Sequence, residues 1–165
     1  MNRTPADSTS TSGAAPAPSG TLTPYIIVKG AAKAIEFYVR VFGAVEQYRL
    51  TEPGGSGKLG HAELAIGAGR LMLADEFRDF GALAPSSVGG TPVSLHLEVA
   101  DVDAVVARAA SAGATIVRSP KDEFFGERRA TIVDPFGHCW FVGTPKEAVT
   151  PAEMQRRWNR MMAQG

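Results

Sequence analysis

Histidine and carboxylate side chains alternate in two short stretches of the 165-residue sequence. His61 and Glu63 occupy the first stretch, and Ser94, His96 and Glu98 occupy the second. Residues two apart on a β-strand point to the same face, so each set lies on one face of its strand. The intervening residues are apolar and favour a helix-packed opposite face. Both sets are therefore expected to line the concave side of a curved sheet.

These polar residues admit three kinds of chemistry. If the two sets converge, two imidazoles and two carboxylates could bind a divalent metal. Alternatively, burial could raise the pKa of one carboxylate and make it a general base, or the groups could contact a ligand directly. If the sets do not converge, they are hydrogen-bonding partners on a solvated sheet face.

An aromatic and cationic segment provides a further candidate site. Phe124 and Phe125 precede Arg128 and Arg129 by a few residues. Such a set could form a wall for a planar or anionic ligand. The alternative is a strand end with phenylalanines in the core and solvated arginines.

Two strand-helix units that position these residues repeat along the chain. A strand at 25–28 leads to a helix closing at Phe42-Gly43, and a strand at 93–99 leads to a helix closing at Ala112-Gly113. Val28 and Val99 are 71 residues apart, as are Ala34 and Val105 in the helices, and Gly43 and Gly113 are 70 apart. The repeat predicts two pseudo-symmetric modules around a cleft.

The remaining segments complete an α+β fold of two βαβββ modules. Alternation and turn residues predict strands at 44–50, 61–66, 70–75, 115–118, 127–133 and 138–142, a turn at 134–137, and a last helix from Thr150. The predicted organisation is a disordered tail at 1–23, module one at about 24–76, a crossover at 77–91 without a clear period, module two at about 92–145, and a C-terminal helical extension at 146–165.

Charge and cysteine content exclude several classes of protein. Seventeen basic residues balance 17 acidic ones without a run of like charge, so nucleic acid and membrane surfaces are not expected partners. No stretch has the apolar length of a membrane helix. The lone Cys139 excludes an intrachain disulfide and fits a reducing compartment. We expect a cytoplasmic protein.

Several segments together resemble the PhnB-like branch of the vicinal oxygen chelate superfamily, which includes glyoxalase I, extradiol dioxygenases and bleomycin-resistance proteins. The resemblance covers about residues 22–145. It rests on 24–44, which includes Ala34-Ile35-Glu36-Phe37-Tyr38, and on Asp134-Pro135-Phe136-Gly137-His138-Cys139-Trp140, with 60–64, 71–76 and 124–128 in support. The resemblance implies curved sheets, a homodimer and ligand sites in the sheet concavities.

The metal-ligand positions of this superfamily hold other residues here. Alignment places Thr23, Ser94 and Phe141 at three of them, and the fourth falls near Leu73 or Ala74. These side chains do not suit a divalent ion, although Asp75 and Glu76 lie close to the fourth position. An aromatic ring at 141 instead offers apolar stacking area.

We interpret the chain as a small-molecule-binding protein that needs no metal or other cofactor and sequesters a drug or hydrophobic or aromatic metabolite. The alternative is a metal-dependent glyoxalase-like lyase, isomerase or dioxygenase that uses His61, Glu63, His96 or Glu98 with a divalent ion. A third possibility is an interaction module that functions through its dimer surface.

Overall fold

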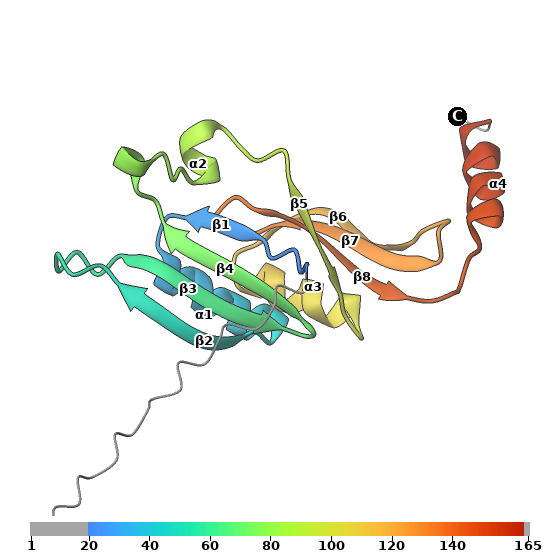
Figure 1. The fold of residues 1–165 in the computed structure, drawn as a ribbon. Helices are drawn as coiled ribbons and strands as arrows, with labels where there is room; N and C mark the ends of the chain where they lie inside the picture. The colour runs from blue at the N-terminus through green and yellow to red at the C-terminus, as the bar shows by residue number, and fades with distance from the viewer. Residues whose placement is uncertain (1–19, 164–165) are drawn as a thin grey trace, which may run out of the picture.

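The computed structural model describes residues 20–163, so most of the predicted tail at 1–23 lies outside the described residues. Module one consists of β1 (Tyr25–Val28), α1 (Ala31–Phe42), β2 (Val45–Thr51), β3 (Leu59–Ile66) and β4 (Gly69–Asp75). Module two consists of β5 (Ser94–Glu98), α3 (Val102–Ser111), β6 (Thr115–Asp122), β7 (Glu127–Val133) and β8 (Cys139–Pro145). The predicted βαβββ order is confirmed in both halves (Figure 1).

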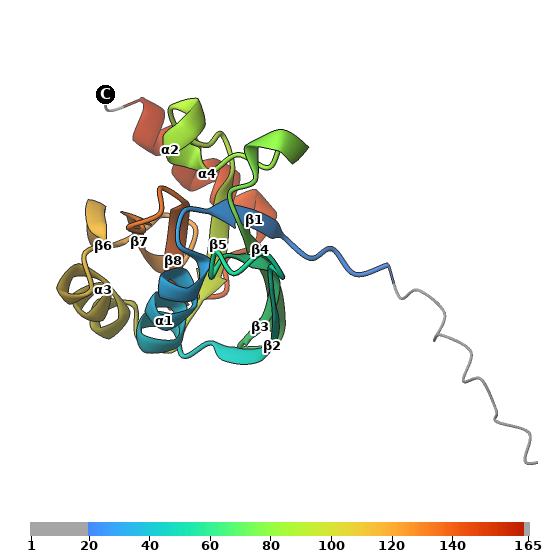
Figure 2. The ribbon, with the colours of Figure 1, turned by 90° about the vertical axis from the view of Figure 1, so that its left-hand side faces the viewer.

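Each module forms one four-stranded mixed sheet. The strand orders are β1-β4-β3-β2 and β5-β8-β7-β6, so the first strand of each module pairs in parallel with its last. The two helices begin 71 residues apart, at Ala31 and Val102, as the repeat predicts. Helices α1 and α3 lie next to one another, with sheet one against α1 (Figure 2).

Helix α1 forms because apolar residues recur at helical spacing along one face. Ala34, Tyr38 and Val41 are completely buried on that face. The helix ends at Gly43, whose left-handed backbone (φ 68°) lets its N–H donate to the Val39 carbonyl. The predicted glycine stop is confirmed.

The two helix starts are held by different side chains. Asp75, at the end of β4, accepts hydrogen bonds from the backbone N–H groups that open α1, including that of Ala31 at 3.0 Å. In module two, Asp101 caps α3 by accepting from Ala104 N–H at 3.0 Å, and Thr144 of β8 accepts from the first helical N–H at 2.9 Å. Both arrangements satisfy amide groups that lack partners within the helix.

The crossover contains two short helices that the sequence pattern does not predict. They are η1 (Arg78–Phe80) and α2 (Pro85–Val88). The buried Glu76 organises this segment, because its carboxylate accepts from Ala84 N–H at 2.9 Å and from Arg78 Nε at 3.0 Å. Hydrogen bonding by Ser87 and Ala84 lowers the pKa of Glu76 to about 2.

A buried polar link joins the modules at α1 and β8. Oδ2 of Asp134 accepts from the Tyr38 hydroxyl at 2.7 Å and from Trp140 Nε1 at 2.9 Å. The Phe42 and Trp140 rings are 4.6 Å apart. Burial, followed by the nearby Asp134 carboxylate, raises the pKa of Tyr38. Both modules therefore share one core.

Helix α4 (Pro151–Met162) stands apart from the two sheets at the C-terminal end (Figure 1). Thr150 caps it by accepting from Glu153 N–H at 3.3 Å, and the helix begins where the sequence predicts. No residue of α4 is buried, and the Trp158 ring touches the domain through Phe124, with 5.4 Å between centroids. None of the helices in the described part of the chain is long and apolar enough to cross a membrane.

Candidate functional site

The candidate site lies on the sheet faces turned away from α1 and α3, which we call the open faces. Strand alternation and register place the predicted residues His61, Glu63, Ser94, His96 and Glu98 there. The intervening residues of β3, among them Ala62 and Leu64, are completely buried on the helix side. The predicted orientation of both polar sets is thus observed.

On the open face of module one, His61 lies between two tyrosines. Its Nδ1 is 3.0 Å from the Tyr25 hydroxyl, and its Nε2 is 3.1 Å from the Tyr48 hydroxyl. A neutral imidazole donates from one nitrogen and accepts at the other, so one tyrosine donates and the other accepts. Partial burial, and secondarily Tyr48, raises the pKa of Tyr25. The cluster can donate to and accept from a neutral polar ligand.

The second predicted group of module one is engaged in an ion pair. Glu63 is buried, and its Oε1 lies 3.1 Å from Nη1 of Arg70. Arg70 comes from β4, which pairs with β3 across the hairpin at 67–68. The ion pair gives the buried Glu63 a partner within its own module.

On the open face of module two, His96 pairs with a carboxylate that the sequence analysis did not select. Its Nε2 is 2.9 Å from Oε1 of Glu127 on β7. The side chain of Glu127 crosses the backbone of Gly143 on β8, and a Cβ at that position would collide with the carboxylate. Gly143 therefore provides the space that allows this contact between β7 and β5.

Arg129 lies beside this pair between two aromatic rings. Its guanidinium carbon is 4.3 Å from the Phe141 ring centroid and 5.3 Å from that of Phe125. Such distances are typical of cation–π contacts. Of the predicted aromatic and cationic wall, Phe125 and Arg129 lie together, and Phe141 joins them; binding of a ligand there stays a prediction.

Two of the predicted wall residues point elsewhere. Arg128 occupies the opposite face of β7, where its Nε donates to Asp103 of α3 at 2.7 Å and its Nη1 donates to Asp122 at 3.1 Å. These two carboxylates raise the pKa of Arg128. Phe124 contacts Trp158 of α4. The placement of Arg128 in the wall is wrong, because alternation along β7 turns it away from Arg129.

The two histidine-carboxylate sets do not converge within one chain. His61 and His96 each have partners within their own module, and Ser94 and Glu98 are exposed on β5. Among residues 20–163, no three histidine, cysteine, aspartate or glutamate side chains are grouped to hold a metal ion. The donor groups described in a single chain thus do not fit the divalent ion of metal-dependent relatives.

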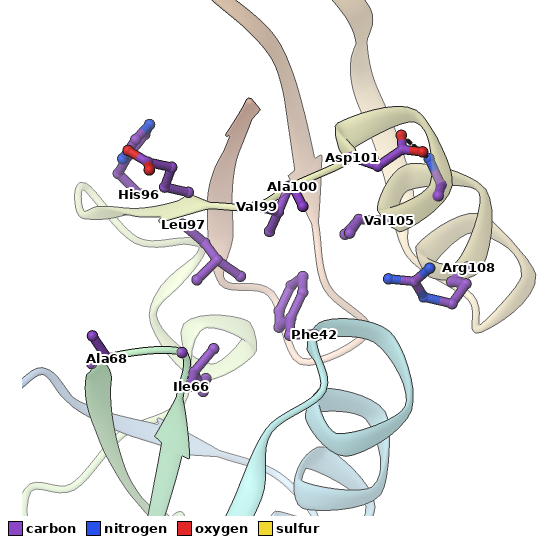
Figure 3. Close-up of a pocket in the computed structure, with 14 residues that line it drawn as sticks. Phe42, Ile66, Ala68, His96, Leu97, Val99, Ala100, Asp101, Val105 and Arg108 are labelled. Carbon is purple, nitrogen blue, oxygen red and sulfur yellow. Dashed lines mark hydrogen bonds between the residues drawn. The ribbon is translucent and has the colours of Figure 1, made fainter. Parts of the chain in front are cut away.

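A groove of about 560 Å³ separates the β3–β4 hairpin from β5 and α3. Figure 3 shows Phe42, Ile66 and Leu97 turned toward one another in this groove, while His96 points to the other side of β5. Arg108 borders it and donates to the Val41 carbonyl at 3.2 Å, at the end of α1. Apolar side chains line much of this crevice between the modules, and the polar residues His96, Glu98, Asp101 and Arg108 also border it.

A second groove lies between β4 and β5. It has a volume of about 530 Å³ and is lined mainly by apolar side chains. Ser94 and His96 border it, together with Trp140. An apolar part of a ligand on the open face could extend into this groove.

Sequence reasoning missed Tyr25, Tyr48 and Glu127 as members of these clusters, and it grouped Arg128 with Arg129. Alternation gives the signal that separates the two arginines, because Glu127, Arg129 and Thr131 share a face of β7. The partners of His61 come from β1 and β2, which are separated from it in sequence. The register of these strands, which requires the fold, brings them together.

Paired βαβββ modules with open sheet faces define the class of this protein. The chain belongs to the glyoxalase/bleomycin resistance protein/dioxygenase superfamily, whose family model matches residues 20–142. An uncharacterised Mycobacterium tuberculosis protein, Rv0887c, is 45% identical over 137 residues, covering 81% of this chain and 79% of that protein. Membership of the superfamily is confirmed, and assignment to its PhnB-like branch stays a prediction.

Solved structures of other proteins have the same fold. TioX from Micromonospora sp. ML1 is 27% identical with a TM-score of 0.58, covering 79% of this chain and 100% of that one. The fosfomycin resistance protein FosX from Listeria monocytogenes, complexed with Mn(II) and sulfate, is 17% identical with a TM-score of 0.60, covering 84% and 99%. The FosX likeness supports the fold alone.

Proposed function

We propose that this protein binds a small planar or aromatic compound on its open faces, without a metal or other cofactor, and thereby sequesters it. The observation that carries the proposal is the stack of Phe125, Arg129 and Phe141 beside the His96–Glu127 pair. Aromatic rings supply flat apolar area, and the polar pair supplies orienting hydrogen bonds.

The first module supplies a complementary surface in this proposal. The Tyr25–His61–Tyr48 cluster offers hydroxyl and imidazole groups that can change between donor and acceptor. A ligand with neutral polar groups could be held there without a full charge. The two open faces would thus recognise different parts of a ligand, or two ligands.

We propose that a homodimer packs along the β2 edge of the open face of module one, beside the Tyr25–His61–Tyr48 cluster. Val45 and Leu50 project from this edge strand and are 59% and 58% exposed. A second copy that packed against this edge would bury both side chains. Sedimentation of the wild type as a dimer and of Leu50→Glu as a monomer is expected, and a monomeric wild type at micromolar concentration would contradict the arrangement.

Ligand binding is tested by thermal stabilisation with a panel of planar drugs and aromatic metabolites. A ligand present at 100 times its Kd should stabilise the native state by about 2.7 kcal/mol. Phe141→Leu should weaken binding because it removes the ring that stacks on Arg129. Phe80→Leu is the matched control, since Phe80 is 85% exposed in the crossover. A panel that leaves the melting temperature unchanged contradicts the proposal.

A metal-dependent lyase, isomerase or dioxygenase is the alternative function. A metal analysis separates it from the binding proposal. FosX shows that this fold accommodates Mn(II) in another protein. Elemental analysis of protein purified without chelator should give no stoichiometric divalent metal. A stoichiometric metal that is lost in His96→Ala would replace the binding proposal. A cytoplasmic location stays a prediction.

A further inference from the structure

Arg129 has an unusual environment among the arginines of the described chain. Its side chain is only 25% exposed, yet its guanidinium donates no hydrogen bond to an acceptor within residues 20–163. The nearest carboxylate oxygen is Oε2 of Glu127, and it lies 3.8 Å from Nε, beyond hydrogen-bond distance. A half-enclosed guanidinium with free donors favours an oxyanion as its partner.

Other partly enclosed arginines have their donors occupied. Arg128 donates to both oxygens of Asp103, and Arg157 donates to both oxygens of Glu147. Arg108 donates twice to the Val41 carbonyl. Arg129 differs because its neighbours are rings, which attract the cation but accept no conventional hydrogen bond. The rings thus orient the guanidinium of Arg129 but leave its N–H donors without hydrogen bonds among the described residues.

The surrounding charges leave room for an anion. Glu127 shares its carboxylate between two partners, because Oε1 contacts His96 at 2.9 Å and Oε2 forms a longer ion pair with Arg129 at 3.8 Å, which leaves the N–H donors of Arg129 without a hydrogen bond to it. Lys121 faces Arg129 across the β6–β7 pair, and Arg118 nearby is paired with Glu123 at 2.9 Å. The exposed carboxylate of Glu98 lies one strand farther away, opposite Gly143. Lys121 therefore adds a second cation on the β6 side of Arg129.

We propose that Arg129 is the anchor for an oxyanion carried by a planar ligand, with Phe141 and Phe125 holding the guanidinium and stacking on the ligand. A carboxylate would accept two parallel hydrogen bonds from the fixed planar fork of the guanidinium. The rings pre-orient Arg129, so binding costs less side-chain entropy than it would for a free arginine. This inference deepens the proposed binding function, on which it rests, by assigning the ligand class as aromatic oxyanions.

The test uses matched neutral and charged probes with the full chain. Isothermal titration calorimetry compares naphthalene-2-carboxylate with naphthalene-2-carboxamide, which has the same ring and size without the charge. We expect the wild type to prefer the carboxylate by roughly 10- to 100-fold, as charge-assisted hydrogen bonds imply. Titration with 2-naphthyl phosphate then shows whether a carboxylate or a phosphate is the better oxyanion.

Two variants and a control assign the preference to Arg129. Arg129→Gln should bind carboxylate and carboxamide about equally, and Arg129→Lys should restore part of the preference because it keeps charge without the fork. Arg128→Gln removes the same charge one residue away on the opposite face and should keep the wild-type preference. Thermal melting checks that each variant is folded before titration.

The outcomes separate this inference from the proposed function. Equal affinity of the wild type for carboxylate and carboxamide overturns the oxyanion anchor but leaves small-molecule binding intact. A carboxylate preference that survives in Arg129→Gln also overturns the anchor. If the wild type binds neither probe and no compound of the wider panel, the binding function itself fails.

Discussion

The open face of module one holds a histidine between two tyrosine hydroxyls, whereas that of module two presents a guanidinium between two aromatic rings. In module one, His61 is bracketed by Tyr25 and Tyr48, and the nearby Glu63 is paired with Arg70. In module two, a histidine on the first strand contacts a glutamate on the third. Arg129 on that third strand is stacked on Phe125 and Phe141 without a hydrogen-bonding partner among residues 20–163.

The contrast shows what a duplicated scaffold does and does not determine. Both sheets have the same strand order, so both direct alternate residues to an open face. The histidines nevertheless sit on different strands, β3 in one module and β5 in the other. The repeat determines which strand positions point to the open face, and the side chains at those positions determine the chemistry of each face.

The largest expected effect comes from breaking the polar link that unites the two modules. Asp134→Ala would leave the Tyr38 hydroxyl and the Trp140 N–H without their acceptor in the core. We expect a loss of about 3 to 5 kcal/mol in the free energy of unfolding, measured by urea denaturation. Asp79→Ala, in the exposed η1 segment, should change stability by less than about 0.5 kcal/mol.

A two-step transition in the Asp134→Ala variant would show that each module can unfold by itself. A single transition at lower urea concentration is expected, because the shared core still couples the modules. If Asp134→Ala and Asp79→Ala proved equally stable, the polar link would not hold the modules together.

A pair of glycine substitutions compares a crowded strand position in module two with an open one in module one. Gly143→Ala should cost about 0.5 to 1.5 kcal/mol, because its methyl group displaces the Glu127 carboxylate from its contact with His96. The same change at Gly60 on β3 meets only the Leu50 carbonyl oxygen at 3.9 Å and should be nearly neutral. Thermal unfolding measures both, and equal losses would contradict a specific role for the space at Gly143.

Removal of one tyrosine hydroxyl tests the Tyr25–His61–Tyr48 cluster of module one. Tyr48→Phe deletes one of the two hydrogen bonds to His61, and we expect a cost of about 0.5 to 1 kcal/mol because the group is partly solvated. NMR of the His61 ring nitrogens should show a changed tautomer balance, while the His96 signals stay in place. Unchanged His61 signals would mean that the contact is not maintained in solution.

Acid should loosen the crossover between the modules. Glu76 has its pKa lowered from 4.5 to about 2, so the stabilisation that its carboxylate provides is complete above pH 4.5 and is lost as the pH falls toward 2. Hydrogen-exchange protection of the Ala84 amide should fall over this range, since Glu76 accepts from it. Glu76→Gln should remove most of this pH dependence, and a wild-type protection factor that is constant from pH 5 to 2 would contradict the assignment.

Local sequence patterns were sufficient to predict most helices and strands. They were insufficient to predict which side chains contact one another at the site. The strand at 127–133 and the glycine that ends α1 are observed as predicted, because both depend on neighbouring residues. The β6 strand extends to Asp122, beyond the predicted end at Arg118, through irregular pairing with β7. The crossover helices were missed because they are short and have no apolar period.

The sequence by itself determined the double module and the face on which His61, Glu63, His96 and Glu98 lie, because the repeat and the alternation are local properties of the chain. Only the tertiary structure decided which groups meet, since strand register joins residues that are far apart in sequence. It set Arg129, in place of Arg128, between the rings of Phe125 and Phe141, and kept the two histidines in separate clusters. Side-chain direction follows from local geometry, whereas the partner of each side chain depends on the packing of the whole chain.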